Sequence, residues 1–170
     1  MDYKSLIREV PDFPKPGILF YDITTLLKNG RAFRAILDDL AEKYRDRRID
    51  KVVSIESRGF ILGGPLAYQL GAGFVPVRKA GKLPADIFEV KYNLEYGSSS
   101  LAIHRDAIAM GERVLIVDDL LATGGTAAAT VHLIRQLGGE IVATVFLIEL
   151  VGLGGRAKMD SCEIHSVITY

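Results

Sequence analysis

Hydrophobic residues recur along the chain with two different periods, which predict helices and strands in alternation. Between residues 31 and 47 the apolar side chains fall three or four positions apart, a pattern typical of an amphipathic helix. Short apolar runs predict strands at 51–55, 74–77, 113–117 and 141–150, and the patterns between them predict helices at 59–70 and 126–137. Strands that are apolar on both faces and alternate with helices indicate an α/β fold with a Rossmann-like, mostly parallel sheet flanked by helices.

Two segments depart from this alternation. Residues 1–9 can form a short helix, but the prolines and the glycine of residues 11–17 exclude regular structure after it, because proline lacks an amide hydrogen and glycine frees the backbone. Apolar and polar residues alternate from 88 to 96, which predicts an extended β arm with one polar face within residues 84–100. This arm is compatible with a lid over a site and with a simple edge hairpin.

Composition and charge narrow the class of protein. Hydrophobic residues make up 49% and charged residues 25% of the 170 residues, which favours one globular domain with a real core. Lys plus Arg and Asp plus Glu number 21 each, so the formal net charge is zero, which argues against nucleic acid as the main partner.

The chain has the features expected of a cytoplasmic protein that does not bind membranes. Its longest apolar runs, such as 141–148, are too short to span a bilayer. Met1 leads directly into charged sequence rather than into an apolar signal region. Cys162 is the only cysteine, so an intrachain disulfide is impossible, which fits a reducing compartment.

The segment from Asp118 to Thr126 carries the clearest sign of chemistry. An apolar strand ends in two aspartates, and a loop of small and hydroxyl residues then opens a helix. Ligands of parallel sheets bind beyond the carboxyl ends of the strands, and a helix start attracts phosphate through its free amides and its dipole. Gly124 and Gly125 let an anion approach the backbone closely, and Thr123 and Thr126 add hydroxyl donors.

Asp118 and Asp119 cannot favour a phosphate directly, so they suit ribose hydroxyls or the water of a bound Mg²⁺. The alternative for the whole segment is a plain strand–loop–helix turn with threonine as the N-cap, but the complete string favours a phosphate site. Neither a G-x-x-x-x-G-K-[ST] string nor a G-x-G-x-x-G string occurs, so other nucleotide fingerprints are excluded.

The segment Asp118–Thr126 resembles the motif with which type I phosphoribosyltransferases bind 5-phosphoribosyl 1-pyrophosphate (PRPP), a ribose 5-phosphate that carries a pyrophosphate on C1. Four other segments resemble adenine phosphoribosyltransferases, in the order in which they occur there. Phe13–Thr24 is similar to the base-covering hood of that family, and Leu94–Gly97 is similar to its flexible catalytic loop. Glu56–Phe60 and Arg78–Pro84 are similar to its pyrophosphate-side loops. The match covers nearly the whole chain.

The resemblance implies the type I phosphoribosyltransferase fold in a single domain, residues 1–170, with a hood at 1–30 and a flexible lid at 84–100. Both aspartates of the motif would hold the ribose hydroxyls, and the loop after them would hold the 5-phosphate. The residues concerned are Asp118, Asp119, Ala122, Thr123, Gly124, Gly125 and Thr126.

The resemblance also assigns roles in the hood and the lid. Phe20 would stack on the purine, while main-chain groups near Leu19 and Tyr21 would read its edge. The family commonly has arginine at the position of Tyr21, a change that main-chain recognition can survive. Glu95 would be the acid/base group that faces the purine, with a pKa raised by loop closure, and Tyr96 would be a lid contact.

Basic residues follow the predicted strands at 51–55 and 74–77. Arg58 comes after the first of them, and Arg78, Lys79 and Lys82 come after the second. By the resemblance they would bind the pyrophosphate, whose departure needs cations to stabilise the developing charge. A solvated surface is the alternative, and for Lys82 taken alone it is the better one.

The implied reaction is adenine + PRPP → AMP + pyrophosphate, with Mg²⁺ held through PRPP and water near Asp118 and Asp119 rather than by direct protein ligands. A homodimer and a cis peptide at Glu56–Ser57 are also expected from the resemblance. Two alternatives remain open: a phosphoribosyltransferase for another purine, such as xanthine or guanine, and a regulator that binds PRPP without catalysis. The zero net charge and the lack of an added DNA-binding segment speak against the regulator.

Overall fold

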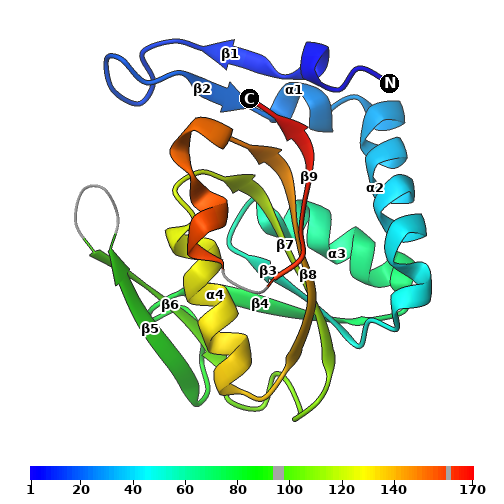
Figure 1. Cartoon of the computed structure of the whole chain (residues 1–170), viewed down its shortest axis with the longest axis vertical. Coiled ribbons are helices and arrows are strands. Elements are labelled where there is room, and N and C mark those ends of the chain that lie inside the picture. Colours follow the sequence, from blue (N-terminus) through cyan, green and yellow to red (C-terminus); the bar gives the residue numbers. More distant parts are fainter. Residues whose placement is uncertain (94–97, 160–161) are drawn as a thin grey trace. The chain divides into compact units, whose positions relative to one another are not determined.

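A computed structural model describes residues 1–93, 98–159 and 162–170, which form two units, Met1–Glu42 and Lys43–Tyr170 (Figure 1). The elements of the first unit are the 3-10 turn η1 (Lys4–Leu6), the strands β1 (Arg8–Val10) and β2 (Phe20–Asp22), and the helices α1 (Thr24–Leu27) and α2 (Gly30–Tyr44), the last of which runs into the second unit.

The predicted helix at 1–9 is wrong beyond η1, because residues 8–10 pair with β2 instead. The irregular segment predicted at 11–17 is confirmed.

Asp22 ties the β1–β2 hairpin to the helix that follows. The backbone amide of Thr24 donates a hydrogen bond to its carboxylate at 2.9 Å, at the start of α1. Arg8 donates two more, from Nε at 3.0 Å and from Nη2 at 2.7 Å, across the register pair of the hairpin. Hydrogen bonds from Thr24 and the charge of Arg8 lower the pKa of Asp22 to about 2. The carboxylate therefore stays ionised and holds strand and helix together.

The second unit is built on a sheet, which among the described residues has seven strands in the order β5-β6-β4-β3-β7-β8-β9. The strands from β4 to β9 in this order run parallel, and the hairpin of β5 and β6 is added antiparallel at one edge. Their bounds are β3 (Lys51–Ile55), β4 (Gly73–Lys79), β5 (Ile87–Asn93), β6 (Ser98–His104), β7 (Arg113–Leu121), β8 (Glu140–Glu149) and β9 (Ile164–Thr169). The predicted mostly parallel sheet is confirmed.

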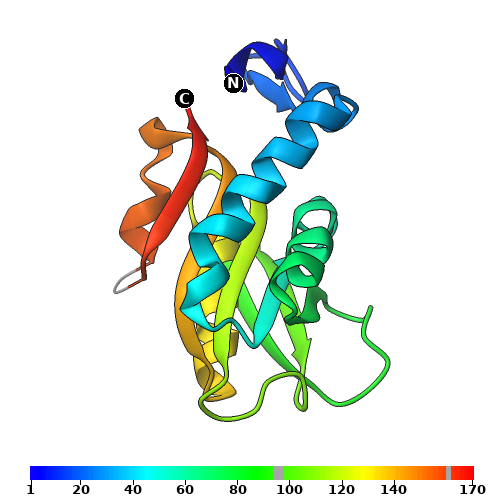
Figure 2. The ribbon, with the colours of Figure 1, turned by 90° about the vertical axis from the view of Figure 1, so that its right-hand side faces the viewer.

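Helices cover both faces of this sheet (Figure 2). The side chains of Val53 and Ile55 point into the core on the face of α4 (Gly125–Gln136). Ser54, between them, points to the opposite face, where α3 (Gly59–Leu70) packs through Gly63. Short 3-10 turns complete the unit: η2 (Arg45–Arg47), η3 (Val151–Leu153) and η4 (Gly155–Lys158). In the described part of the chain, no helix is long and apolar enough to cross a membrane.

Most predicted elements lie within one or two residues of the observed ones, and 51–55 and 59–70 have the predicted bounds. The helix predicted at 31–47 is one exception, because α2 ends at Tyr44 and the 3-10 turn η2 follows it. The strand β7 is the other, because it continues through both aspartates to Leu121 instead of ending at 117. Asp118, Leu120 and Leu121 pair with β8, so their backbone groups are satisfied within the sheet. The loop between β7 and α4 is thereby reduced to residues 122–124.

The predicted β arm is an antiparallel hairpin, and its alternation has a structural cause. Phe88, Val90 and Tyr92 pack against the core on the α4 face, whereas Glu89 and Lys91 are exposed. The guanidinium of Arg105 lies 4.1 Å from the centre of the Phe88 ring, which covers the outer end of the arm.

We expect alanine at Gly63 to destabilise the fold by about 1–3 kcal/mol, because its methyl group would clash with the Ser54 hydroxyl. The Ser54 hydroxyl is buried and has no hydrogen-bond partner among the described residues, so Ser54→Ala alone should cost little stability. The double variant should recover part of the loss. Denaturant unfolding of the four proteins measures these free energies, and strictly additive effects would contradict the contact.

Candidate active site

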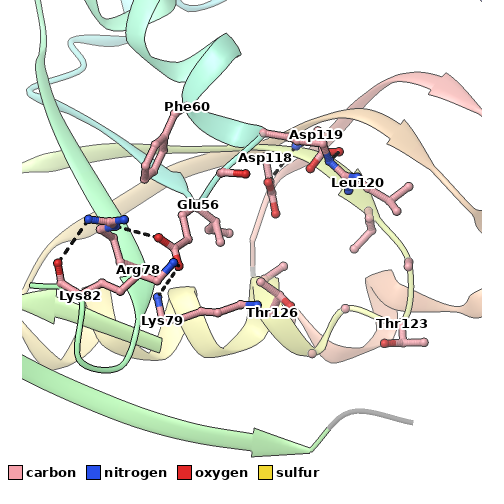
Figure 3. A pocket seen from close by; sticks show the side chains of 18 residues that line it. Glu56, Phe60, Arg78, Lys79, Lys82, Asp118, Asp119, Leu120, Thr123 and Thr126 are labelled. Atoms are coloured by element: carbon pink, nitrogen blue, oxygen red, sulfur yellow. Dashed lines mark hydrogen bonds and ion pairs between the residues drawn. The ribbon is translucent and has the colours of Figure 1, made fainter. Parts of the chain in front are cut away.

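A cleft of about 660 Å³ opens where β3, β4 and β7 end (Figure 3). One wall is formed by residues 55–58 with Phe60, at the turn from β3 into α3. Arg78, Lys79 and Lys82, from the end of β4, form the second wall, and residues 118–127 form the third. Because parallel strands present their carboxyl ends at one edge, three segments far apart in the sequence meet here.

Residues 122–126 form the turn from β7 into α4, and we call them the anion cup. Gly124 has a φ of +79°, a conformation that favours glycine. It is also the N-cap of α4, and in the described part of the chain no side chain caps this helix. The alternative of a threonine-capped turn is therefore wrong, and the first amides of α4 are left without partners inside the helix. Such a helix start can bind an anion.

Asp118 and Asp119 are buried beside the anion cup, with 8% and 7% of their surface exposed. Asp119 Oδ2 lies 2.6 Å from Nε of Arg58, so this carboxylate is neutralised by an ion pair. Asp118 Oδ1 instead accepts a hydrogen bond from the amide of Asp119 at 2.9 Å, and Gly59 leaves room for it. Burial, reinforced by the charge of Asp119, raises the pKa of Asp118 well above its ordinary value.

Glu56, in the first wall of the cleft, contacts the three cations of the second wall (Figure 3). Its carboxylate accepts hydrogen bonds from Nε of Arg78 at 2.7 Å and from the amide of Lys79 at 3.1 Å, and Nζ of Lys82 lies 3.4 Å away. Burial alone would raise the pKa of Glu56, but these three partners lower it. The Lys79 side chain extends along the cleft in the direction of Thr126. The carboxylate thus fixes a turn that carries three positive charges.

The structure brings together all the residues predicted after β3, β4 and β7. Those that line the one cleft are Arg58, Arg78, Lys79, Lys82, Asp118, Asp119, Ala122, Thr123, Gly124, Gly125 and Thr126. Leu19, Phe20 and Tyr21 lie in the N-terminal unit, where Phe20 makes an edge-to-face contact with Phe13 at 5.1 Å between ring centres. Glu95 and Tyr96 fall outside the described residues. The peptide Glu56–Ser57 is cis, as expected.

Two contributions to the site escape the sequence. The hydroxyl of Thr126 donates a hydrogen bond to that of Tyr92 at 3.3 Å, which connects the anion cup to the β5–β6 hairpin. The alternation places Tyr92 on the inner face of the hairpin, but gives no sign of its partner in α4. The second contribution is the side chain of Glu56, whose segment was matched to a pyrophosphate-side loop without a role for this residue. The signal that could have found it is its position directly after the buried strand β3.

Known proteins resemble this chain over its whole length. The family model described as the phosphoribosyl transferase domain matches residues 22–164. A protein of Acaryochloris marina named adenine phosphoribosyltransferase is 62% identical over 170 residues, which cover 100% of both chains. One of the same name from Solibacter usitatus is 57% identical over 169 residues, 99% of this chain and 98% of the other.

Solved structures agree with the fold. The crystal structure of adenine phosphoribosyltransferase from Thermoanaerobacter pseudethanolicus superposes with a TM-score of 0.95 at 52% identity, covering 99% of this chain and 98% of the other. The enzyme of Saccharomyces cerevisiae, in complex with an imino-altritol bisphosphate and adenine, gives a TM-score of 0.92 at 42% identity, covering 98% and 96%. On these similarities in sequence and structure, the chain belongs to the adenine phosphoribosyltransferase family of type I phosphoribosyltransferases.

Proposed function

We propose that the chain transfers the 5-phosphoribosyl group from PRPP to adenine and releases AMP and pyrophosphate. The observation that carries the proposal is a single cleft in which an anion cup, two buried carboxylates and a cluster of cations face one another. The choice of adenine is supported by the relatives, one of which has 62% identity and another of which is bound to adenine.

In this proposal the ribose 5-phosphate occupies the anion cup. The amides at the start of α4 and the hydroxyls of Thr123 and Thr126 donate hydrogen bonds to the phosphate. Asp118 and Asp119 accept hydrogen bonds from the ribose hydroxyls. Hydroxyl donors compensate a buried carboxylate for the water it has lost, which suits the burial of both side chains.

The pyrophosphate of PRPP binds Arg58, Arg78, Lys79 and Lys82 in this proposal. Positive charge there stabilises the leaving group as C1 of the ribose gains oxocarbenium character and adenine N9 attacks from the opposite face. Arg78 uses Nε and Nη1 for contacts within the protein. A guanidinium carries five N–H donors, so Arg78 can bind phosphate without giving up these contacts.

The base would be bound by the hood at 1–30, with Phe20 stacked on the purine and main-chain groups near Leu19 and Tyr21 at its edge. The β1–β2 hairpin supports this role, because residues 20–22 are held in extended register opposite residues 8–10. Residues 84–100 would form the lid, with Glu95 as acid/base group and Tyr96 as a contact. Closure would exclude water, which otherwise hydrolyses the cation at C1.

Phosphoribosyltransferases generally use Mg²⁺ with PRPP, and in this proposal the ion is held through PRPP and water near Asp118 and Asp119 rather than by direct protein ligands. Mg²⁺ at phosphate sites keeps several of its waters, whose hydrogens a carboxylate can accept. The ion would neutralise the charge of the pyrophosphate. A single domain over residues 1–170, a homodimer and a cytoplasmic location stay predictions, supported by the family resemblance and the composition.

An assay with PRPP, Mg²⁺ and a panel of bases tests the function. Adenine should give AMP, identified by mass, with a kcat/KM at least about 100-fold above that for hypoxanthine, guanine or xanthine, because a site built for one set of hydrogen bonds rejects the others. Preferred turnover of guanine or xanthine would support the other purine specificity instead. Pyrophosphate release from none of the bases would support a PRPP-binding regulator.

We expect Glu95→Gln to lower kcat by about 10²–10⁴-fold, because glutamine keeps the shape of the side chain but cannot exchange a proton. The affinity for PRPP should change far less. Steady-state kinetics and PRPP titration measure the two effects. Glu89→Gln, on the exposed face of β5, is the matched control and should keep its turnover. Unchanged turnover of Glu95→Gln would remove Glu95 from the mechanism.

Asp118→Asn should stabilise the ligand-free protein while it weakens PRPP binding. Because the pKa of Asp118 is raised in the folded state, its ionisation opposes folding as pH rises through that pKa. The gain should therefore be largest at neutral and alkaline pH and vanish toward the ordinary pKa of 3.8. A gain of about 1 kcal/mol would raise Tm by about 2–4 °C in a domain of this size.

Thermal unfolding between pH 5 and pH 9 measures this effect, and Asp106→Asn, an exposed aspartate, is the control. A change in Tm that does not depend on pH would contradict the assignment.

A further inference from the structure

A second stretch of backbone packs directly against the anion cup, and it comes from the segment after β8 (Figure 1). A methyl group on Gly124 would clash with the carbonyl of Gly155, and one on Gly155 would clash with the carbonyl of Ala122. The same methyl group on Gly155 would lie 3.1 Å from the amide nitrogen of Gly124. The two turns are too close to admit a side chain, so the backbone at Gly155 is the support on which this side of the cup rests.

Arg156, the residue after Gly155, ties this segment to the sheet. Its Nε and Nη2 each donate a hydrogen bond, at 2.6 Å, to a different carboxylate oxygen of Glu149 at the end of β8. The hydroxyl of Ser166 in β9 donates a third, also at 2.6 Å. We call Glu149, Arg156 and Ser166 the β8–β9 clamp. Arg156 Nη1 also donates to the carbonyl of Ile164 at 3.3 Å, so the segment is attached to two neighbouring strands.

Stability alone is a weak reason for this arrangement. The Glu149 side chain is only 4% exposed, and taking a carboxylate out of water costs about as much as its ion pair returns. Apolar contacts already hold the segment, since Met159 is buried against Leu121 and Phe146. The two-pronged ion pair fixes the orientation of Arg156 relative to Glu149, because two parallel N–H···O bonds hold the guanidinium and the carboxylate in one plane.

We propose that the β8–β9 clamp positions the anion cup, by holding Gly155 against Gly124 and Ala122 so that the amides of the cup keep the spacing of a phosphate. This inference rests on the proposed function of the cup. In the described part of the chain, no member of the clamp lines the cleft, so the clamp acts through the backbone rather than on the substrate. Glu149, Arg156 and Ser166 are therefore positioning residues.

The kinetic consequence follows from where the phosphate sits. The 5-phosphate takes no part in the bonds that form and break at C1, so the cup binds the ground state and the transition state alike. Loss of such uniform binding raises KM and leaves kcat unchanged. A displaced cup should therefore raise the KM for PRPP and lower the affinity for AMP, but leave the binding of free adenine unchanged.

Arg156→Lys tests the proposal, because lysine keeps the charge but cannot form the two-pronged pair. We expect the KM for PRPP and the Kd of AMP to rise about tenfold, and kcat and the Kd of adenine to stay within about twofold. Ser166→Ala removes one of the three hydrogen bonds to Glu149 and should have the same effect to a smaller degree. Kinetics and calorimetric titration with AMP and with adenine supply the readouts.

Arg113→Lys is the matched control. Arg113 Nη1 lies 2.5 Å from Glu140 Oε1, so it also pairs the neighbouring strands β7 and β8, but at the end far from the cup. This variant should leave the KM for PRPP unchanged, whatever it does to Tm.

An Arg156→Lys protein with a lowered Tm and a wild-type KM for PRPP would overturn the proposal, since the clamp would then only stabilise the fold. Where that variant does not fold, Ser166→Ala decides by the same criterion. Failure of the proposed function has a separate signature, because the wild-type protein itself would then release no pyrophosphate from PRPP and adenine.

Discussion

The amides at the start of α4, which have no partner inside the helix, are the feature on which the rest of the cleft depends. An amide binds phosphate well only if it is held in place beforehand, because reorienting dipoles during binding costs the energy that the contact returns. Three constraints hold this turn. The strand β7 stays paired with β8 to Leu121, Gly124 bends the chain at a φ of +79°, and Gly155 closes the space behind it. The phosphate would therefore meet a surface fixed from both sides.

Around this turn, the charged side chains form two groups that each contain both signs. Arg58 pairs with Asp119 in one group, and Glu56 pairs with cations in the other. Asp118 and Asp119 lie on the side of the anion cup, and the cations after β4 gather around Glu56. Without Glu56, three positive side chains on one short turn would repel one another and spread into solvent. With it, they stay close enough to meet the several charges of one pyrophosphate. Glu56 lowers the total positive charge of this group by one unit, but its contacts fix where the cations lie.

How much of this could be predicted from the sequence depends on the range of the interactions. The strand 51–55 and the helix 59–70 are determined locally, by an apolar run and by its flanking residues, and both were predicted with their bounds. The continuation of β7 was missed because two adjacent aspartates favour a loop, and only pairing with β8 overrides that preference. The contact of Gly124 with Gly155 and that of Thr126 with Tyr92 join residues about thirty positions apart, for which a single sequence gives no signal. Family resemblance, and not periodicity, supplied the roles of Phe20 and Glu95.

The free-energy cost of burying carboxylates is concentrated at one edge of the sheet, where the strands end. Among the described residues, the acidic side chains with less than a tenth of their surface exposed are Glu56, Asp118, Asp119 and Glu149. All lie near the ends of β3, β7 and β8, whereas the centre of the sheet buries no charged side chain in the described part of the chain. Arg58, Arg78 and Arg156 compensate three of these charges. Asp118 has a raised pKa, and its donor among the described residues is the backbone amide of Asp119. A ligand that offers hydroxyl groups to Asp118 removes this deficit, and whatever binds only the folded state stabilises it. Under the proposed function, the position that weakens the empty protein is thus the one through which a ribose would stabilise it most, which would account for the burial of a carboxylate there.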